Sequence, residues 1–255
     1  MAQAQVAGVE RLTPSHYWEM GGTLHVKEET TLRLVRLDGD SLVVEGAALS
    51  KAFFAQDASS VGAGSYDSLA GQTSVDTIET SDIEALNRTM RARTAHSRWA
   101  PITGIHLSWL EEIDPILDLI EADDAQWELA DGERLVGAAL TAVVGQGRGV
   151  AVATKMLHLK RPRLFPILDR FVVEILGGRI PDDALPNIRA QEATRLVVHL
   201  RRQGRDNVHA LKEIQAQLSK QGFERSLVRI LDAILWPSHP AGRIPSARVY
   251  KIEGA

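Results

Sequence analysis

The residues best suited to chemistry lie between Gly145 and Gly178. A glycine-rich turn opens this stretch, a basic helix and a proline-bounded loop follow, and Asp169 stands at the start of the next predicted helix. Asp169 is the only acidic residue from Gly145 to Arg170. Backbone N–H groups at a helix N-terminus suit phosphate, and a lone carboxylate nearby suits chemistry on the molecule that carries the phosphate. The basic side chains of the stretch are Arg148, Lys155, Lys160, Arg161, Arg163 and Arg170.

The overall composition limits the classes of function. The 255-residue chain has a formal charge of -4, so any contact with nucleic acid requires a local patch of positive charge. It contains no cysteine, which excludes disulfides, thiol catalysis and cysteine-ligated metal centres. The N-terminus lacks the apolar run of a signal peptide, and no apolar stretch of about 18 residues predicts a membrane span. We therefore expect a cytoplasmic protein without membrane attachment.

Strand patterns occur only near the N-terminus. Residues 23–49 are rich in strand-forming residues on both sides of Asp38-Gly39, a pair typical of hairpin turns. Residues 55–78 are rich in Gly, Ser, Asp and Thr and predict a loop or linker. The sequence therefore predicts a mainly α protein with a small N-terminal β-hairpin element. The expected parts are a β-containing region with its linker over 1–78, a helical domain over 79–240 and a C-terminal tail over 241–255.

Apolar residues recur at helical spacing from residue 80 onward, which predicts seven or eight helices. The predicted helices cover residues 80–90, 110–120, 124–144, 150–160, 168–177, 193–202, 208–220 and 223–235. The glycines of Gly145-x-Gly147-x-Gly149 therefore lie between two helices. A dinucleotide-binding fingerprint requires a strand before its glycines. The pattern instead favours a helix-hairpin-helix over about residues 133–160, whose turn presents backbone amides to DNA phosphate.

This arrangement resembles the helix-hairpin-helix DNA glycosylase superfamily. Gly145 and Gly147 stand where that superfamily has its glycine hairpin. Pro162 and Pro166 lie in the loop that follows, and Asp169 takes the place of an essential aspartate at the start of the next helix. The resemblance is close over this stretch, whereas the flanking helices agree in order and type. It implies a helical DNA-binding fold with Asp169 as the catalytic carboxylate.

Two departures from the superfamily pattern bear on the expected reaction. Its bifunctional members carry a nucleophilic lysine just after the hairpin, where this chain has Gly149 or Ala151, and Lys155 lies about one helical turn further along. We therefore expect hydrolysis without lyase activity. Val144 also replaces the usual proline before the first glycine.

Residues 155–169 resemble a second, uncharacterised bacterial family that is common in actinobacteria. Its sequences carry a K-x-L-x-x-K-R-P-R-L-x-P-x-x-D box, which this chain matches in order from Lys155 to Asp169. The box is specific, but it brings no established activity.

Cleavage of a base–sugar bond builds positive charge on the sugar, which a carboxylate stabilises, and the base must first leave the stack and enter a pocket. Segment 82–109 is polar and aromatic enough to line such a pocket. The candidates are Asn87, Arg91, His96, Ser97, Trp99 and, on the basic helix, His158. A competing interpretation, which we slightly favour, makes Trp99 a core aromatic and pairs the arginines with the acidic run 111–133. His158 likewise suits the core best.

The sequence thus predicts a DNA-binding N-glycosylase that excises a damaged base or a modified base of invading phage DNA. Asp169 is the expected catalytic residue, and no metal or other cofactor is expected, because His158 and Asp169 lack a third ligand at suitable spacing. In the main alternative, Asp169 only caps its helix and the protein is a non-catalytic DNA- or protein-binding module; a nucleoside or nucleotide hydrolase is a third class. The expected contacts to DNA are Gly145, Gly147, Arg148, Gly149, Lys155, Lys160, Arg161, Arg163 and Arg170.

Overall fold

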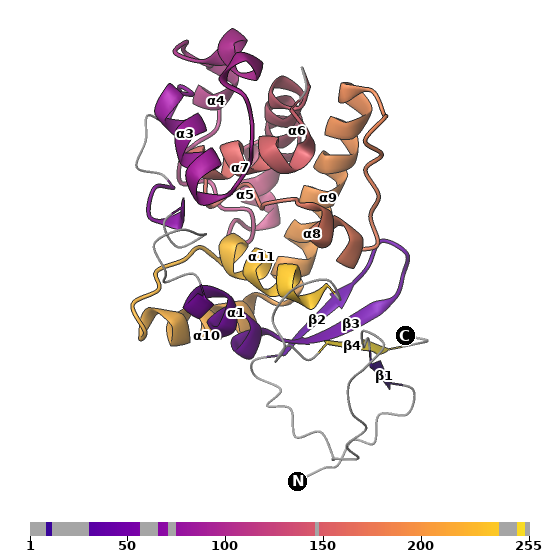
Figure 1. Cartoon of the computed structure of the whole chain (residues 1–255). Helices are drawn as coiled ribbons and strands as arrows, with labels where there is room; N and C mark the ends of the chain where they lie inside the picture. Colours follow the sequence, from indigo (N-terminus) through magenta and orange to yellow (C-terminus); the bar gives the residue numbers. More distant parts are fainter. Residues whose placement is uncertain are drawn as a thin grey trace.

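Figure 1 presents the computed structural model, which describes residues 9–11, 31–56, 66–70, 75–145, 148–239 and 249–252. The protein is mainly α with a small antiparallel β-hairpin near the N-terminus, as the sequence predicts. No described helix is long and apolar enough to cross a membrane. The helices are α1 (Gly46–Gln56), α3 (Thr80–Thr89), α4 (Ser108–Glu111), α5 (Asp124–Leu129), α6 (Gly132–Val143), α7 (Val150–Lys160), α8 (Arg170–Ile175), α9 (Pro186–Asp206), α10 (Val208–Ser219) and α11 (Leu227–Ser238), with short 3-10 turns η2 (His96–Arg98) and η3 (Ala100–Ile102).

The β-hairpin consists of β2 (Thr31–Val35) and β3 (Ser41–Glu45). The turn between them contains Gly39, whose φ of 91° suits a residue without a Cβ. Two further strands, β1 (Val9–Arg11) and β4 (Val249–Ile252), complete a sheet of order β1-β4-β3-β2. The strand in the predicted C-terminal tail therefore pairs with the N-terminal hairpin, a contact between chain ends that local sequence patterns do not reveal.

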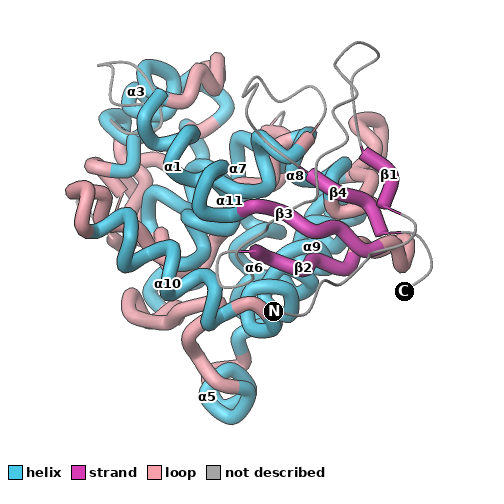
Figure 2. Tube along the Cα trace, turned by 90° about the horizontal axis from the view of Figure 1, so that it is seen from below, coloured by secondary structure: helices cyan, strands magenta, loops and turns pink. Residues whose placement is uncertain are grey.

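Figure 2 shows α9 beside the sheet. Side chains of α9 and of the residue that follows it cover the outer edge of β2. His199 Nε2 donates to the carbonyl of Val35 at 2.8 Å, and Gln203 Oε1 accepts from the Val35 N–H at 2.6 Å. Asn207 accepts from the Arg33 N–H at 2.9 Å and donates to its carbonyl at 2.8 Å. The three side chains are four residues apart and share one helix face. They therefore satisfy a sheet edge that would otherwise offer unpaired backbone groups.

Helix α11 forms the centre of the core: every residue from Leu227 to Leu235 is buried. Helix α1 packs against α11. The sequence does not predict α1, because the strand-forming pattern continues to residue 49. A Cβ on Gly46 would lie 2.4 Å from Leu32 Cδ1 and 2.7 Å from Ile214 Cδ1. This close approach fixes the start of α1 through tertiary contacts, which the local sequence does not record.

Several predicted helices are wrong in extent, and the one expected over 193–202 is part of the longer α9, Pro186–Asp206. The helix expected over 110–120 is confined to α4, because Pro115 lacks an N–H and disfavours helical backbone in the preceding residue. The helix expected over 124–144 is divided into α5 and α6 at Asp131, whose φ of 52° is left-handed. Of the predicted linker 55–78, the described part includes Tyr66, which is fully buried and belongs to the core.

We expect Asn207→Ala to destabilise the protein by about 1–3 kcal/mol, because it leaves the N–H and carbonyl of Arg33 without their side-chain partners. Urea unfolding measures this loss, and amide hydrogen exchange at Arg33 is expected to accelerate. Gln221→Ala, which removes an exposed glutamine, serves as the control and should change stability by less than about 0.5 kcal/mol. Equal stabilities of the two variants would show that α9 does not secure the sheet edge.

Candidate functional site

Helix α7 follows α6 after a few residues, and Gly145 and Arg148 pair with each other across the connection. The N–H of Gly145 donates to the carbonyl of Arg148 at 3.1 Å, and the N–H of Arg148 donates back at 2.7 Å. Gly145 has a φ of 141°, which favours glycine. Gly149 directly precedes α7, and a Cβ built on it would meet nothing within 4 Å. The predicted contact at Gly147 lies outside the described residues.

Arg148 holds this turn in place and is not an exposed phosphate contact. Its Nε donates to the carbonyl of Val143 at 2.7 Å, and its Nη1 donates to the carbonyl of Arg98. The guanidinium lies over the Trp99 ring, with Cζ 5.1 Å from the centroid. Only 2% of the residue is exposed, so the predicted DNA contact is incorrect for this side chain. Arg148 instead links the segment around Arg98 to the turn through its hydrogen bonds.

Lys160 and Arg161, the two central cations of the box over residues 155–169 (the basic box), are also buried. Lys160 forms an ion pair with Asp82, and both side chains are at most 1% exposed. Arg161 donates to Asp76 and to the carbonyl of Leu110, at 2.8 and 2.6 Å, and its other nitrogens bond to further carbonyls. Burial of a charge requires such compensation. Lys160 and Arg161 therefore stabilise the fold, and their predicted contact with DNA phosphate is incorrect.

Arg163 and Arg170 are exposed but have acidic partners. Arg163 bonds to Asp118 and to Glu121, each at 3.0 Å. Arg170 bonds to Glu174 one helical turn away, also at 3.0 Å. Two carboxylates of the acidic run 111–133 thus form ion pairs with Arg163 of the basic box. Each of these exposed arginines therefore has a carboxylate partner with which a DNA phosphate would compete.

Asp169 is the N-cap of α8, where one carboxylate oxygen, Oδ1, accepts from the Val172 N–H at 3.1 Å. The other oxygen, Oδ2, receives no hydrogen bond from the described residues, and the side chain is partly exposed. Two further ionisable side chains, Lys155 and Asp232, lie near it. Burial lowers the pKa of Lys155, while the charges of Asp169 and Asp232 oppose that effect. Asp169 therefore combines the capping role with a free carboxylate oxygen beside a half-buried lysine.

A buried ion network lies next to this carboxylate, and sequence reasoning missed it. Arg229 on α11 bonds to Asp232 and to Asp67, the latter at 2.7 Å. Arg225 bonds to the second oxygen of Asp67 at 2.9 Å. Burial raises the pKa of Asp232 to about 7, the Arg229 guanidinium opposes this, and the charge of Asp169 adds to it. The signal in the sequence was an Arg and an Asp three apart inside an otherwise apolar run, LVRILDAILW.

His158 is a core histidine, in line with the preferred interpretation of the sequence. It is 1% exposed, its ring stacks on Tyr66 at 5.7 Å, and its Nδ1 donates to the carbonyl of Phe165 at 2.6 Å. The Tyr66 hydroxyl donates in turn to the carbonyl of Lys155. Burial lowers the pKa of His158 to about 4, so the ring is neutral at pH 7 with its lone pair on Nε2.

The remaining candidates for a base pocket do not converge on one cavity. Trp99 is fully buried and its indole N–H donates to Thr94 at 3.0 Å, so it is a core residue, as the favoured interpretation of the sequence predicts, and it does not stack on a base. Asn87 is occupied by both backbone groups of Thr94. His96 and Ser97 are exposed on η2.

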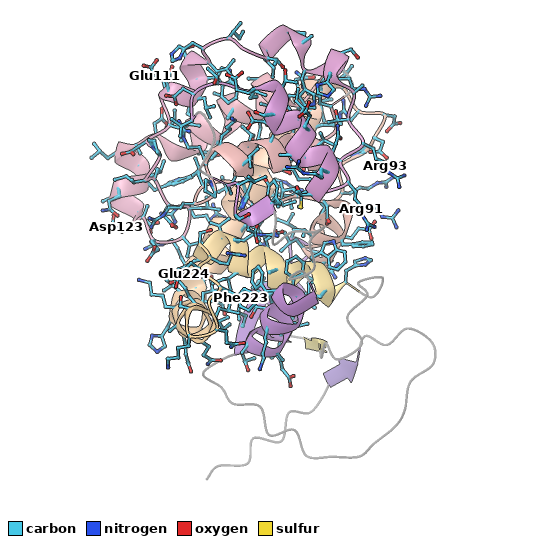
Figure 3. The ribbon with its side chains drawn as sticks, turned by 60° about the vertical axis from the view of Figure 1, so that its left-hand side comes forward. Arg91, Arg93, Glu111, Asp123, Phe223 and Glu224 are labelled. Carbon is cyan, nitrogen blue, oxygen red and sulfur yellow. The ribbon has the colours of Figure 1, made fainter. Side chains whose placement is uncertain are left out.

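An exposed basic surface instead carries Arg88, Arg91 and Arg93. Arg91 and Arg93 have φ values of 48° and 50°, a left-handed conformation that is uncommon outside glycine. Within the described part of the chain, none of the three forms an ion pair. Figure 3 shows Arg91 and Arg93 pointing into solvent on the side away from Glu111 and Asp123. We call these three residues the arginine surface.

Metal binding has no support from the geometry of the described residues. No group of three His, Cys, Asp or Glu side chains there is placed to hold a metal ion.

Comparison with known proteins places the chain in a family. The model of DUF6308, a family of unknown function, matches residues 47–239, so the chain belongs to this family. The matched range runs from α1 to the end of α11 and includes the hairpin, the basic box and Asp169. No curated protein and no solved structure matches the chain.

We expect Lys160→Met and Asp82→Asn each to destabilise the protein by about 3–5 kcal/mol, because each leaves an uncompensated buried charge or polar group. In urea unfolding, the double variant should lose less stability than the sum of the two single losses. Arg170→Met breaks an exposed pair and should cost less than about 1 kcal/mol. Similar losses for Lys160→Met and Arg170→Met would contradict the burial of Lys160.

The neutral state of His158 predicts a loss of stability in mild acid. Its pKa is about 4 in the folded protein against 6.5 as the ordinary value. Below pH 6.5 the unfolded chain therefore binds a proton that the folded chain does not, and stability falls until the pH passes the folded pKa. We expect a loss of about 2 kcal/mol from this group between pH 7.5 and pH 5, measured by urea unfolding. His158→Met should flatten the profile by that amount, and an unchanged slope would refute the assignment.

Proposed function

We propose that this DUF6308 protein is a DNA-binding, monofunctional N-glycosylase-like hydrolase that excises a damaged or modified base by using Asp169. The observation that carries the proposal is the carboxylate of Asp169, which comes after the α6–α7 helix pair in the chain and is oriented by the N–H of Val172. Its other oxygen has no hydrogen-bond partner among the described residues and belongs to a partly exposed side chain. A fixed carboxylate with one free oxygen suits the stabilisation of positive charge on a sugar.

In the proposed reaction, the base–sugar bond breaks and its electron pair leaves with the base. Asp169 stabilises the resulting positive charge on the sugar and orients or deprotonates the water that attacks it. The departing base takes up a proton. Lys155 lies in the electrostatic field of Asp169, whose charge opposes the lowering of the Lys155 pKa by burial. The proposal assigns no covalent bond to Lys155.

The DNA-binding surface in this proposal combines the hairpin with the arginine surface. The N–H groups of Val150 and Ala151, at the start of α7, have no acceptor within the helix and can donate to a phosphate, and a Cβ on Gly149 would meet nothing within 4 Å. The bond from Arg148 to the carbonyl of Arg98 ties the hairpin to the segment that follows the arginines. Arg88, Arg91 and Arg93 thereby replace Lys160 and Arg161 as the proposed phosphate contacts. The same unpaired arginines also favour the alternative of a non-catalytic DNA-binding module.

An abasic-site assay tests the reaction. The protein is incubated with genomic and phage DNAs that carry varied base modifications, and alkali then converts abasic sites into strand breaks. We expect breaks with the native protein and a loss of about 100-fold or more with Asp169→Asn, because the charge that stabilises the sugar is removed. Asp206→Asn, an exposed aspartate at the end of α9, is the matched control and should retain activity. Breaks without alkali, or trapping of the protein on DNA by borohydride, would refute the absence of lyase activity.

Binding measurements separate the enzyme from the binding module. Arg91→Gln combined with Arg93→Gln should weaken binding to duplex DNA and reduce the salt slope by about 0.9 per lost contact. Asp169→Asn should leave that affinity unchanged. Salt-dependent binding by both proteins without strand breaks on any DNA would favour the binding module. No binding at all would refute the nucleic-acid function.

A further inference from the structure

The reaction assigned to Asp169 leaves one requirement without a group to meet it, which is the proton that the departing base takes up. A base that departs without a proton carries a negative charge, and a positioned acid that removes this charge accelerates such steps by about 100-fold or more. The donor has to lie beside Asp169, reach the surface and be free of other bonds. Lys155 on α7 is the side chain to test against these conditions.

Helix α7 is bonded to the segment that leads into α8, next to Lys155 and Asp169. The hydroxyl of Thr154 accepts from the N–H of Leu168 at 3.1 Å. This bond joins the residue before Lys155 to the residue before Asp169, so the two backbones are held together at this point. The carbonyl of Lys155 accepts from the buried Tyr66 hydroxyl, which further fixes this turn of α7. The positions of Lys155 and Asp169 relative to each other are therefore set by hydrogen bonds.

The ammonium group of Lys155 is available to a bound molecule. Among the described residues, its Nζ has neither a hydrogen-bond acceptor nor an ion-pair partner, although its charge interacts with Asp169 and Asp232. The residue is partly exposed, and Nζ is not one of the enclosed side-chain atoms that lack a partner, so it reaches the surface. The same holds for Oδ2 of Asp169. The two side chains therefore offer a proton donor and a free carboxylate oxygen to one molecule.

The surroundings of Lys155 make it a stronger acid than an exposed lysine. Burial lowers the pKa of its ammonium group from the ordinary value of 10.5, and the charge of Arg229 acts in the same direction. The charges of Asp169 and Asp232 oppose this lowering without cancelling it. An acid donates most effectively when its pKa lies near the working pH, so the net lowering favours proton transfer.

The other charged groups around Asp169 are less suitable donors. Asp232 is buried and bonds to Arg229. Arg170 bonds to Glu174 at 3.0 Å. A guanidinium group does not release its proton in a protein, which excludes both arginines. Lys155 is therefore the group near Asp169 that combines a transferable proton with access to the surface.

We propose that Lys155 is the general acid that protonates the departing base, an assignment that rests on the proposed function. The base–sugar bond breaks, its electron pair moves to the base nitrogen, and this nitrogen takes the proton from Nζ of Lys155. Water adds to the sugar carbon and gives a proton to Asp169. That proton returns through solvent to the neutral amine of Lys155. Each turnover consumes one water molecule and restores both side chains to their starting state.

This role defines the class of base that the site removes. A neutral base departs as an anion unless it is protonated, so its removal depends on the proton of Lys155. A base that is already positively charged departs as a neutral molecule and needs no donor. The assignment therefore predicts a substrate with a neutral damaged or modified base.

The test compares Lys155→Met and Lys155→Arg with the native chain in the alkali assay, under single-turnover conditions. The neutral bases are uracil and hypoxanthine in duplex DNA and the modified bases of the phage DNAs, and the cationic base is 7-methylguanine. On the neutral bases that the native chain removes, we expect both variants to lose about 100-fold or more in rate. On 7-methylguanine they should lose little. Arginine keeps the charge but not the transferable proton, so Lys155→Arg would rescue a purely electrostatic or structural role. Lys220→Met, at an exposed position after α10, is the matched control and should retain activity.

A second measurement does not require activity. The pKa of Lys155 is followed by NMR of the full chain with isotope-labelled lysine. We expect a value below 10.5 that falls further in Asp169→Asn, because the charge of Asp169 raises it. A Lys155 signal that does not respond to Asp169→Asn would show that the two side chains do not act on each other, and it would overturn the proposal.

The outcomes separate this role from the proposed function. Native rates for Lys155→Arg on a neutral base would overturn the proton transfer and leave the glycosylase standing, and so would activity of the native chain on 7-methylguanine alone. Borohydride trapping that disappears in Lys155→Met would show a covalent role and would also overturn it. No breaks by the native chain on any of these DNAs would refute the proposed function and this role with it. Circular dichroism confirms folding, and the NMR measurement on the native chain and Asp169→Asn remains decisive should a Lys155 variant fail to fold.

Discussion

The burial of charged side chains is the constraint on which the arrangement of this protein depends. A guanidinium or ammonium group removed from water must be matched by fixed acceptors, since an unmatched charge in the interior costs several kcal/mol. Arg161 shows the consequence most clearly: its nitrogens bond to Val75, Asp76, Leu110 and Ile113. One side chain at the end of α7 thereby positions two irregular segments that have little regular secondary structure of their own. Lys160 acts likewise on the start of α3 through Asp82.

Because of this constraint, the basic box stabilises the fold and does not form a phosphate-binding surface. A run of basic residues on an acidic protein suggests a surface for phosphate, yet Lys160 and Arg161 contribute almost no surface. Arg148, beside the hairpin, is buried in the same way and serves the turn. Exposed arginines without an ion pair among the described residues lie instead at Arg88, near the end of α3, and at Arg91 and Arg93 just after it, the last two labelled in Figure 3.

Helix α11 connects the surroundings of Asp169 with a cavity that Asp169 does not line. Asp232 lies in the electrostatic field of Asp169, whereas Arg229, its partner in the ion pair, lines that cavity. The pair sits in a helix whose other residues from Leu227 to Leu235 are buried, so neither side chain can turn to solvent. Arg229 and Asp232 bond to each other, and Arg229 also bonds to Asp67. The bond to Asp67 fixes the position of α11 against the segment around Tyr66.

The sequence by itself determined the local features of this protein. Asp38-Gly39 specified the turn of the hairpin, the glycines after Val144 specified the turn between α6 and α7, and Asp169 specified a helix start, because each depends on backbone conformation or on partners within a few residues. The tertiary structure alone decided which charges are buried. Lys160 and Asp82 are 78 positions apart, and β4 joins a hairpin more than two hundred residues earlier, so no local pattern relates them. Helix α7 shows the reason: it is buried on nearly all sides, and its hydrophobic pattern therefore contains no information about which polar residue faces the interior.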